Sequence, residues 1–426
     1  MTSEQHADSY YAASAQGIAT HPALEEELTV DVCVVGSGIT GSAAALELAQ
    51  RGYKVAVLEA KRVGWGASGR SGGQLIFGYA AEQSTLTKLV GPDDARKLWT
   101  IADEAVSQTK QRIAEHQIRC DLAEGHFHAA VKPRHMNELK QWHQELTEQY
   151  GYESVEIWDK SRLEQQLGSE AYLGGLYDSN SGHLHPLNYT LGLSRAAVQA
   201  GAQVFEHSPV VKIEQGSTVV LHTPKGKVRA SQVVMSCNAY LDGLAPKVES
   251  KVMPVGTYIT ATEPLGEEQA QALIRNNMAI ADINFVLDYF RLSADHRMLF
   301  GGRVSYSRLD PINLQGAMAK RMHAVFPQLQ QVKQEFTWGG YVGITMNRAP
   351  HFGRQANNIF FAQGFSGHGI ALTGMAGTLM AEAVAGTAER FDLMARIPHH
   401  DFPGGRLLRT PALVLAMAWY RMRDML

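Results

Sequence analysis

The sequence predicts an α/β fold in which a parallel sheet is interleaved with a second, α+β part built on an antiparallel sheet. Three features predict it. An apolar run, a Gly-x-Gly-x-x-Gly turn, a helix and a second apolar run follow one another within residues 30–58. Residues 251–306 alternate as in an antiparallel sheet. A last strand, glycine loop and helix lie in that order within residues 336–385.

The elements follow from local pattern. Val30–Val35 is apolar on both faces, as a buried parallel strand is, and the Ala- and Leu-rich helix after it ends near Gly52. Residues 91–150 have mostly helical periodicity, and a helix over 187–200 ends before Gly201. We further expect strands at 54–58, 203–206, 210–214, 218–222 and 232–236, a hairpin turning at 294–297 and a helix over 314–325.

Composition excludes several classes of protein. Of 426 residues, 45% are hydrophobic and 19% charged, which provides a sizeable core and excludes a disordered chain. Because 39 basic residues balance 42 acidic ones, we expect no nucleic-acid partner. Three scattered cysteines predict neither a disulfide framework nor a metal site. Without a signal peptide or an apolar run of ~18 residues, we expect a soluble, cytoplasmic protein, and both a monomer and a homo-oligomer are compatible with it.

The glycine turn at residues 36–41 carries the first functional signal. Gly36 allows a tight turn, Gly38 lets the backbone approach a pyrophosphate, and Gly41 lets the helix pack on the strand. The phosphates would lie at the positive end of the helix. Glu59, at the end of the second strand, is placed to accept hydrogen bonds from a ribose and disfavours a 2′-phosphate. This pattern predicts dinucleotide binding.

Two further glycine-rich segments favour FAD over a nicotinamide. The loop GWGASGRSGGQ at residues 64–74 suits a backbone that passes the second half of a bulky dinucleotide. Gly364-Phe-Ser-Gly-His-Gly-Ile precedes an Ala- and Gly-rich helix whose N-terminus would stabilise negative charge on a reduced flavin. Taken separately, the first is also typical of a surface loop and the second of a glycine-capped packing helix.

These segments, in this order, resemble the D-amino-acid oxidase (DAO) family of FAD-dependent oxidoreductases, which includes glycine and sarcosine oxidases, over about residues 28–390. The segments SYYAAS, GASGRSGGQL, SGHLHPLN, LDYFRLSADHRMLFGG, QGFSGHG and FPGGR resemble those members that oxidise γ-glutamylputrescine. The resemblance implies a small-molecule amine substrate and O₂ as the electron acceptor. Because no cysteine lies beyond Cys237, we expect FAD to be held non-covalently.

The resemblance also implies a domain organisation of the DAO and glycine oxidase type. We expect an N-terminal arm at 1–27, an FAD-binding domain from 28–90, 151–245 and 336–395, a substrate domain from 91–150 and 246–335, and a tail at 396–426.

Carried over residue by residue, the family pattern implies a set of cofactor-binding positions, with Val210 meeting adenine and Asn238 beside the strand that passes the cofactor. The full set is Gly36, Ser37, Gly38, Ile39, Thr40, Gly41, Glu59, Ala60, Ser68, Arg70, Gly73, Gln74, Val210, Cys237, Gly367, His368, Gly369 and Ile370.

One departure from the family bears on the substrate. Oxidases of free α-amino acids in this family carry a carboxylate-binding Arg just after a strand ending in Trp/Gly. In this chain that stretch is Trp338–Thr345, and Val342 is near the expected place of the Arg. Without a guanidinium there, a carboxylate beside the reacting carbon would lack its partner, which favours an amine such as a polyamine terminus.

The substrate pocket is expected to be aromatic and dry, because burial lowers the pKa of an ammonium group and flavin oxidation needs the neutral amine. No residue is assigned as catalytic with certainty; His368 and His185 are candidates for acid–base work. Arg291 and Arg303 are candidates for binding a remote carboxylate, although salt bridges explain them equally. Candidate substrate-binding residues are Tyr258, Tyr289, Trp338 and Tyr341, with Phe290 beside them, and each is equally typical of an ordinary core.

Three other functions are compatible with these residues. The same fold could act on another polyamine or amino acid, or pass electrons to a membrane quinone. The apolar segment Pro411–Leu426 is typical of a helix packed on the protein or lying on a membrane surface. The third possible function is that of a non-catalytic subunit that holds FAD. Such a subunit would keep its yellow colour when an amine is added without oxygen.

Overall fold

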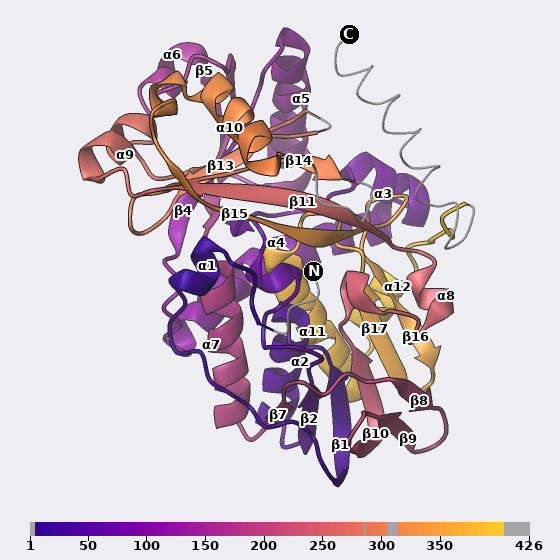
Figure 1. Ribbon diagram of the computed structural model, residues 1–426. Coiled ribbons are helices and arrows are strands. Elements are labelled where there is room, and N and C mark those ends of the chain that lie inside the picture. The colour runs from indigo at the N-terminus through magenta and orange to yellow at the C-terminus, as the bar shows by residue number, and fades with distance from the viewer. Residues whose placement is uncertain (1–4, 285, 306–312, 404–426) are drawn as a thin grey trace.

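A computed structural model describes residues 5–284, 286–305 and 313–403, and contains two sheets with helices packed on them (Figure 1). The predicted Pro411–Leu426 segment and the end of the FPGGR motif lie outside the described residues. The side chain of Arg303 is likewise outside them.

The first sheet has the predicted parallel core. Its strand order is β16-β17-β10-β1-β2-β7, with β9 beside β10 and β8 beside β9. The pairs β7–β2, β2–β1, β1–β10 and β10–β17 are parallel, and the remaining pairs are antiparallel. The strands are β1 (Glu27–Val35), β2 (Val55–Leu58), β7 (Gln203–Phe205), β8 (Lys212–Glu214), β9 (Val219–His222), β10 (Lys227–Met235), β16 (His351–Ala356) and β17 (Ile359–Gln363).

Small residues let the helices pack closely over this sheet. In α11 (Ile370–Val384), a Cβ at Gly377 would lie 2.6 Å from the Thr40 carbonyl oxygen of α2 (Ile39–Gln50), so glycine is needed at this crossing. Helix α7 (Pro186–Gln199) packs against α2, and α4 (Pro92–Glu115) packs against α11. The helix expected over 187–200 and the C-terminal glycine-loop helix are therefore confirmed.

The second sheet has the order β15-β11-β14-β13-β12-β4-β6-β3, with β5 beside β6. The expected hairpin is formed by β13 and β14. Only β4 and β12 pair in parallel among the described strands of this sheet. The strands are β3 (Gln74–Leu75), β4 (Ala123–Ala129), β5 (Val155–Asp159), β6 (Gly174–His183), β11 (Met253–Thr262), β12 (Ala279–Asp282), β13 (Tyr289–Leu292), β14 (Met298–Ser305) and β15 (Gln334–Ile344).

The remaining helices lie around the two sheets (Figure 1). They are α1 (Tyr10–Ala13), α3 (Gln83–Val90), α5 (Pro133–Tyr150), α6 (Lys160–Glu164), α8 (Pro246–Glu249), α9 (Glu267–Leu273), α10 (Leu314–Val325) and α12 (Glu389–Ala395), with short 3₁₀ turns at Ala67–Gly69, Asn238–Tyr240 and Pro327–Leu329. No single helix among these residues is long and apolar enough to cross a membrane. Helices α11 and α12 together are long and apolar enough, but they are bent by 120° relative to each other.

The sheets divide the chain somewhat differently from the expected domain boundaries. Strands β5 and β6 were expected with the FAD-binding part, but they pair into the second sheet. Strand β15 also joins that sheet, whereas β16 and β17 return to the first. Hydrogen bonding along β6 accounts for the difference, because β6 pairs with β3, β4 and β5 and so draws all of them into one sheet.

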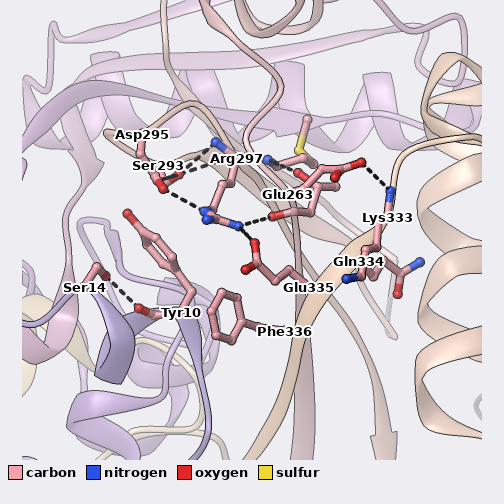
Figure 2. A network of polar contacts seen from close by, with 12 residues as sticks. Tyr10, Ser14, Glu263, Ser293, Asp295, Arg297, Lys333, Gln334, Glu335 and Phe336 are labelled. Carbon is pink, nitrogen blue, oxygen red and sulfur yellow. Dashed lines mark hydrogen bonds and ion pairs between the residues drawn. The ribbon is translucent and has the colours of Figure 1, made fainter.

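The N-terminal arm packs between the two sheets. Tyr11 is fully buried, and its ring lies 5.2 Å from that of Trp338 in β15. Tyr10 packs beside Phe336, and the guanidinium of Arg297 lies over both rings (Figure 2). Arg297 in turn forms ion pairs with Asp295 and Glu335. The arm therefore ties its own chain end to the second sheet.

Candidate active site

One large cavity, of about 1750 Å³, lies where the two sheets meet. The carboxyl ends of β2, β1, β10 and β17 all contribute to its wall, and β1 lies between β2 and β10, where the strand order reverses. Ligands of open parallel sheets bind at such a point. Because a pocket for a drug-sized ligand is about 300–1,000 Å³, this one has room for a dinucleotide and a substrate together.

The glycine turn has the geometry that a dinucleotide-binding turn needs. Gly36 has φ +96°, which favours glycine. A Cβ on Gly41 would lie 1.9 Å from the Gly36 carbonyl oxygen, and one on Gly38 would lie 2.7 Å from Ser68 Oγ. Gly36, Gly38, Ile39 and Thr40 line the cavity, whereas Ser37 and Gly41 shape the turn from behind.

Glu59 lies in the cavity wall with its carboxylate held from both sides. Oε2 accepts a hydrogen bond from Ser37 N at 2.7 Å and Oε1 accepts one from Lys61 N at 2.9 Å. Burial raises the pKa of Glu59, and the two backbone N–H groups partly oppose that shift. Ala60 lies beside it in the same wall. This arrangement fits the ribose ligand that the sequence predicts.

At the same end, Val210 and Cys237 line the cavity. Burial raises the pKa of the Cys237 thiol to about 12. Asn238 also reaches the cavity, and its Oδ1 accepts a hydrogen bond from Gly364 N at 2.9 Å, which joins the end of β10 to the C-terminal glycine loop.

The loop at residues 64–74 follows the cavity wall. Ser68, Gly73 and Gln74 line it, but Arg70 does not. Arg70 Nε donates to the Trp65 carbonyl at 2.7 Å, and its guanidinium lies over the Trp65 ring. The structure therefore places Arg70 as a brace within the loop.

The C-terminal glycine loop lines the cavity at Gly367, His368, Gly369 and Ile370, directly before α11. Gly367 has φ +101°. Burial, with a smaller contribution from the charge of Arg348, lowers the pKa of His368 to about 4. A neutral imidazole and the positive end of a helix thus meet at this part of the wall.

Two of the four expected substrate-binding aromatics reach the cavity. Tyr289 and Tyr341 line it, but Tyr258 and Trp338 are buried elsewhere. Tyr289 depends on glycines around it, since a Cβ on Gly301 would lie 2.0 Å from its ring. Phe290 points into the core of the second sheet, where it stacks on Phe300.

His185 and Arg291 lie away from the cavity wall. His185 caps α7, with Nδ1 accepting from Asn188 N at 3.1 Å, and packs between Tyr10 and Tyr11. The buried Arg291 donates to the carbonyls of Gly72 and Leu184 instead of forming a carboxylate site. The sequence predicts acid–base work for His185 and carboxylate binding for Arg291, but in the structure His185 caps α7 and Arg291 holds backbone carbonyls.

Several cavity residues were not among the sequence candidates. His126 and His128 enter it from β4, and Trp99 and Trp142 enter it from α4 and α5. The sequence signal for His126 and His128 is their spacing, because two residues at positions i and i+2 of a strand face the same side. Within the described residues, no group of three potential metal ligands is placed to bind an ion.

The charges of the cavity wall are mainly negative. Of the described residues that line it, the Lys and Arg residues are Lys61 and Arg348. The acidic residues lining it are Glu59, Glu82, Glu138, Glu145, Asp242 and Asp282. Val342 lines it too, so the position where relatives are expected to have a carboxylate-binding Arg is apolar.

Comparisons with known proteins agree with this geometry. The family model described as FAD dependent oxidoreductase (DAO) matches residues 31–383. A gamma-glutamylputrescine oxidoreductase of Escherichia coli is 42% identical over 99% of both chains. A probable oxidoreductase, OrdL, of Haemophilus influenzae is 43% identical over 99% of this chain and 98% of its own. The crystal structure of glycine oxidase from Geobacillus kaustophilus superimposes with a TM-score of 0.73 at 23% identity, covering 88% of this chain and 99% of that one.

Proposed function

Because this chain belongs to the FAD-dependent oxidoreductase (DAO) family, we propose that it is an amine oxidase whose substrate is γ-glutamylputrescine. The primary amine R–CH₂–NH₂, O₂ and water would be converted to the aldehyde R–CHO, ammonia and H₂O₂. In this reaction the C–N unit loses two electrons and two protons, one hydrogen from carbon and one from nitrogen, and O₂ gains them. Water then hydrolyses the imine R–CH=NH to the aldehyde and ammonia.

End-to-end similarity to the Escherichia coli enzyme carries the proposal. It spans 99% of both chains, so it includes the arm, both sheets and the whole described cavity wall. The apolar Val342 supports the same conclusion, because an amine without a neighbouring carboxylate needs no guanidinium there.

The cavity residues fit FAD. The turn at Gly36–Gly41 and the N-terminus of α2 would hold the pyrophosphate, Glu59 the ribose, and the loop Gly367–Ile370 the flavin end. When bound, FAD would accept the hydride from the amine-bearing carbon and return the electrons to O₂. Non-covalent binding is supported by Cys237, whose raised pKa keeps it a protonated, unreactive thiol.

The rest of the wall suits a cationic substrate. Acidic side chains at Glu82, Glu138 and Glu145 attract it, and the aromatic residues Trp99 and Trp142 present apolar surface in the same cavity. Away from the carboxylates, burial among aromatic side chains favours the neutral form of the amine, which is the form that loses hydride.

An absorbance spectrum of the purified protein, followed by anaerobic addition of amine, tests the proposal. We expect a flavin band near ~450 nm that γ-glutamylputrescine bleaches and that putrescine and glycine leave nearly unchanged. Admitting air should restore the band and release one H₂O₂ per turnover. Absence of flavin after reconstitution with FAD, or a band that γ-glutamylputrescine does not bleach, would contradict the proposal. Restoration by a quinone but not by air would reject O₂ as acceptor.

A further inference from the structure

The turn between β15 and β16 brings a guanidinium into the cavity wall. Arg348 lies in this turn, is half-buried and lines the cavity. The other Lys or Arg among the described residues that line it is Lys61. Lys61 lies at the ribose end, where its backbone N–H donates to Glu59 at 2.9 Å. Within the described part of the wall, Arg348 is therefore the one Lys or Arg away from the ribose end.

The backbone of Arg348 has a conformation that glycine adopts more easily. Its φ is +62°, in the left-handed region. A residue with a long side chain is uncommon there, because its Cβ crowds the following carbonyl oxygen. Residues held in such conformations gather at functional sites, where the surrounding structure fixes them. An arginine at this φ thus favours a function for the side chain itself.

Hydrogen bonds fix the turn that carries Arg348. Thr345 Oγ1 donates to the Ala349 carbonyl at 2.7 Å, and Asn347 Oδ1 accepts from Ala349 N at 3.1 Å. Thr345 N donates to Ser366 Oγ at 3.3 Å, which joins the turn to the C-terminal glycine loop. The Arg348 side chain therefore leaves a fixed backbone next to the loop that would hold the flavin end.

Electrostatic effects relate Arg348 to the histidines of the cavity. Burial lowers the pKa of His368 to about 4, and the charge of Arg348 lowers it further. Burial also lowers the pKa values of His126 and His128, and the charge of His368, not that of Arg348, acts on both of them. Arg348 thus lies near the flavin loop but farther from β4 than His368 does.

The proposed substrate has one carboxylate, and it is remote from the reacting amine. In γ-glutamylputrescine it lies nine bonds from the amine-bearing carbon, which is about 10–11 Å in an extended chain, the length of about three residues. The acidic side chains that dominate the wall would repel it. Arg291, a sequence candidate for this carboxylate, donates to backbone carbonyls instead. Arg348 is the described guanidinium that lines the cavity.

We propose that Arg348 binds the α-carboxylate of the γ-glutamyl group and thereby selects a γ-glutamylated amine over a free polyamine. This inference rests on the proposed function, since it takes γ-glutamylputrescine as the substrate. A guanidinium can donate two parallel N–H bonds to the two carboxylate oxygens. Because the carboxylate is remote from the reacting carbon, the contact is equally strong before and during the reaction. It therefore acts on KM more than on kcat.

The first test compares two substrates on the wild-type holoenzyme. One is γ-glutamylputrescine, and the other is its α-carboxamide analogue, which has the same length and the same reacting amine but no negative charge. We expect kcat/KM to be about 10-fold lower for the carboxamide, mostly through KM, because a charge-assisted hydrogen bond is lost. Equal kcat/KM values would overturn this inference alone. If γ-glutamylputrescine does not reduce the flavin, the proposed function fails and the inference fails with it.

The second test repeats the comparison with substitutions at Arg348. R348Q should lower kcat/KM for γ-glutamylputrescine about 10-fold and change that for the carboxamide less than about 2-fold. R348K should recover part of the preference, because an ammonium keeps the charge but not the two-pronged geometry. An unchanged preference in R348Q, or an equal loss on both substrates, would overturn the assignment.

R354Q is the matched control. Arg354 lies on β16, pairs with Asp392 and does not line the cavity. This variant should keep the wild-type preference for the carboxylate. If R354Q loses the preference to the same extent as R348Q, the effect does not come from a contact with the substrate, and the proposal is wrong.

A binding measurement needs no turnover and uses R348G, which also replaces R348Q if that variant fails to fold with FAD. Glycine adopts φ +62° without strain, so R348G should be at least as thermally stable as R348Q. The ligand is γ-glutamyl-n-butylamide, which has no terminal amine to oxidise. By calorimetry we expect its Kd to be about 10-fold higher for R348G than for the wild-type holoenzyme, with unchanged FAD affinity. An unchanged Kd, or a fall in FAD affinity that accounts for the loss, would contradict the proposal.

Discussion

The guanidinium of Arg291 donates a hydrogen bond to the phenol oxygen of Tyr11 at 3.1 Å, although the two residues are 280 positions apart in the chain. The same guanidinium donates to the carbonyls of Gly72 and Leu184. One buried cation thus joins the N-terminal arm, the loop at residues 64–74 and the segment before α7. The arm is therefore part of the structure that supports the candidate flavin loop.

Replacing Arg291 by Met should loosen this junction. The change removes several hydrogen bonds and leaves buried carbonyls without donors, at a cost of about 1–3 kcal/mol for each unsatisfied group. We expect a lower thermal midpoint and weaker FAD binding, measured by calorimetry and by fluorescence titration of FAD. R51M is the control, because Arg51 is a partly exposed member of an i,i+4 pair. Equal effects of the two variants would contradict the bracing role.

Gly41→Ala should weaken FAD binding with little loss of secondary structure. An added Cβ would lie 1.9 Å from the Gly36 carbonyl oxygen, so the turn that faces the pyrophosphate must move. The variant should be purified nearly colourless and take up FAD at least about 10-fold more weakly, a change of about 1.4 kcal/mol. G216A, in an exposed turn, should bind FAD normally. A yellow G41A protein with unchanged affinity would refute this account of the turn.

Glu145→Gln should raise KM for a cationic substrate and leave kcat nearly unchanged. Burial and the charge of Glu82 raise the pKa of Glu145, which indicates a crowded negative region in the cavity wall. Since the site is partly open to solvent, one carboxylate contributes about 0.5–1 kcal/mol, or roughly 2- to 5-fold in KM. E148Q is the control, because Glu148 lies three residues further along α5 and outside the cavity wall. Steady-state kinetics at low and high salt give KM and kcat for both variants. An effect of E145Q on kcat alone would be inconsistent with substrate attraction.

Acid should destabilise the protein below pH 6.5 through its buried neutral histidines. Burial lowers the pKa of His351 from 6.5 to about 3. Between these two pH values the unfolded chain binds a proton that the folded protein does not, so the free energy of unfolding falls as the pH falls from 6.5 towards 3. Asp282 acts in the opposite direction, because burial raises its pKa to about 6 and the folded protein holds the extra proton. Each group contributes at most about 1.4 kcal/mol per pH unit.

Two variants therefore have opposite expected effects on the thermal midpoint between pH 6.5 and 5. On acidification the thermal midpoint of H351Q should fall less than that of the wild type, and the midpoint of D282N should fall more. Differential scanning calorimetry at three pH values checks both. A common direction for the two variants would show that other groups control acid stability.

Local pattern predicted much of the fold. Buried strands β1 and β2 with the turn between β1 and α2 are determined by neighbouring residues, and the hairpin of β13 and β14 and helix α10 likewise follow from short-range periodicity. The same holds for the cofactor positions at Gly36, Gly38 and Glu59, because their spacing is set within a single βαβ unit.

The sequence by itself therefore determined the nucleotide-binding unit, the elements and the class of chemistry. Only the tertiary structure decided which side chains share the cavity. Trp338 and Tyr258 are aromatic residues in predicted strands, as are Tyr289 and Tyr341, but of these four only Tyr289 and Tyr341 reach the cavity wall. His128 comes there from β4, and Trp142 and Glu145 come from α5. Which face of a strand or helix meets a cavity depends on long-range pairing between β4, β6 and β12, and no local spacing encodes that pairing.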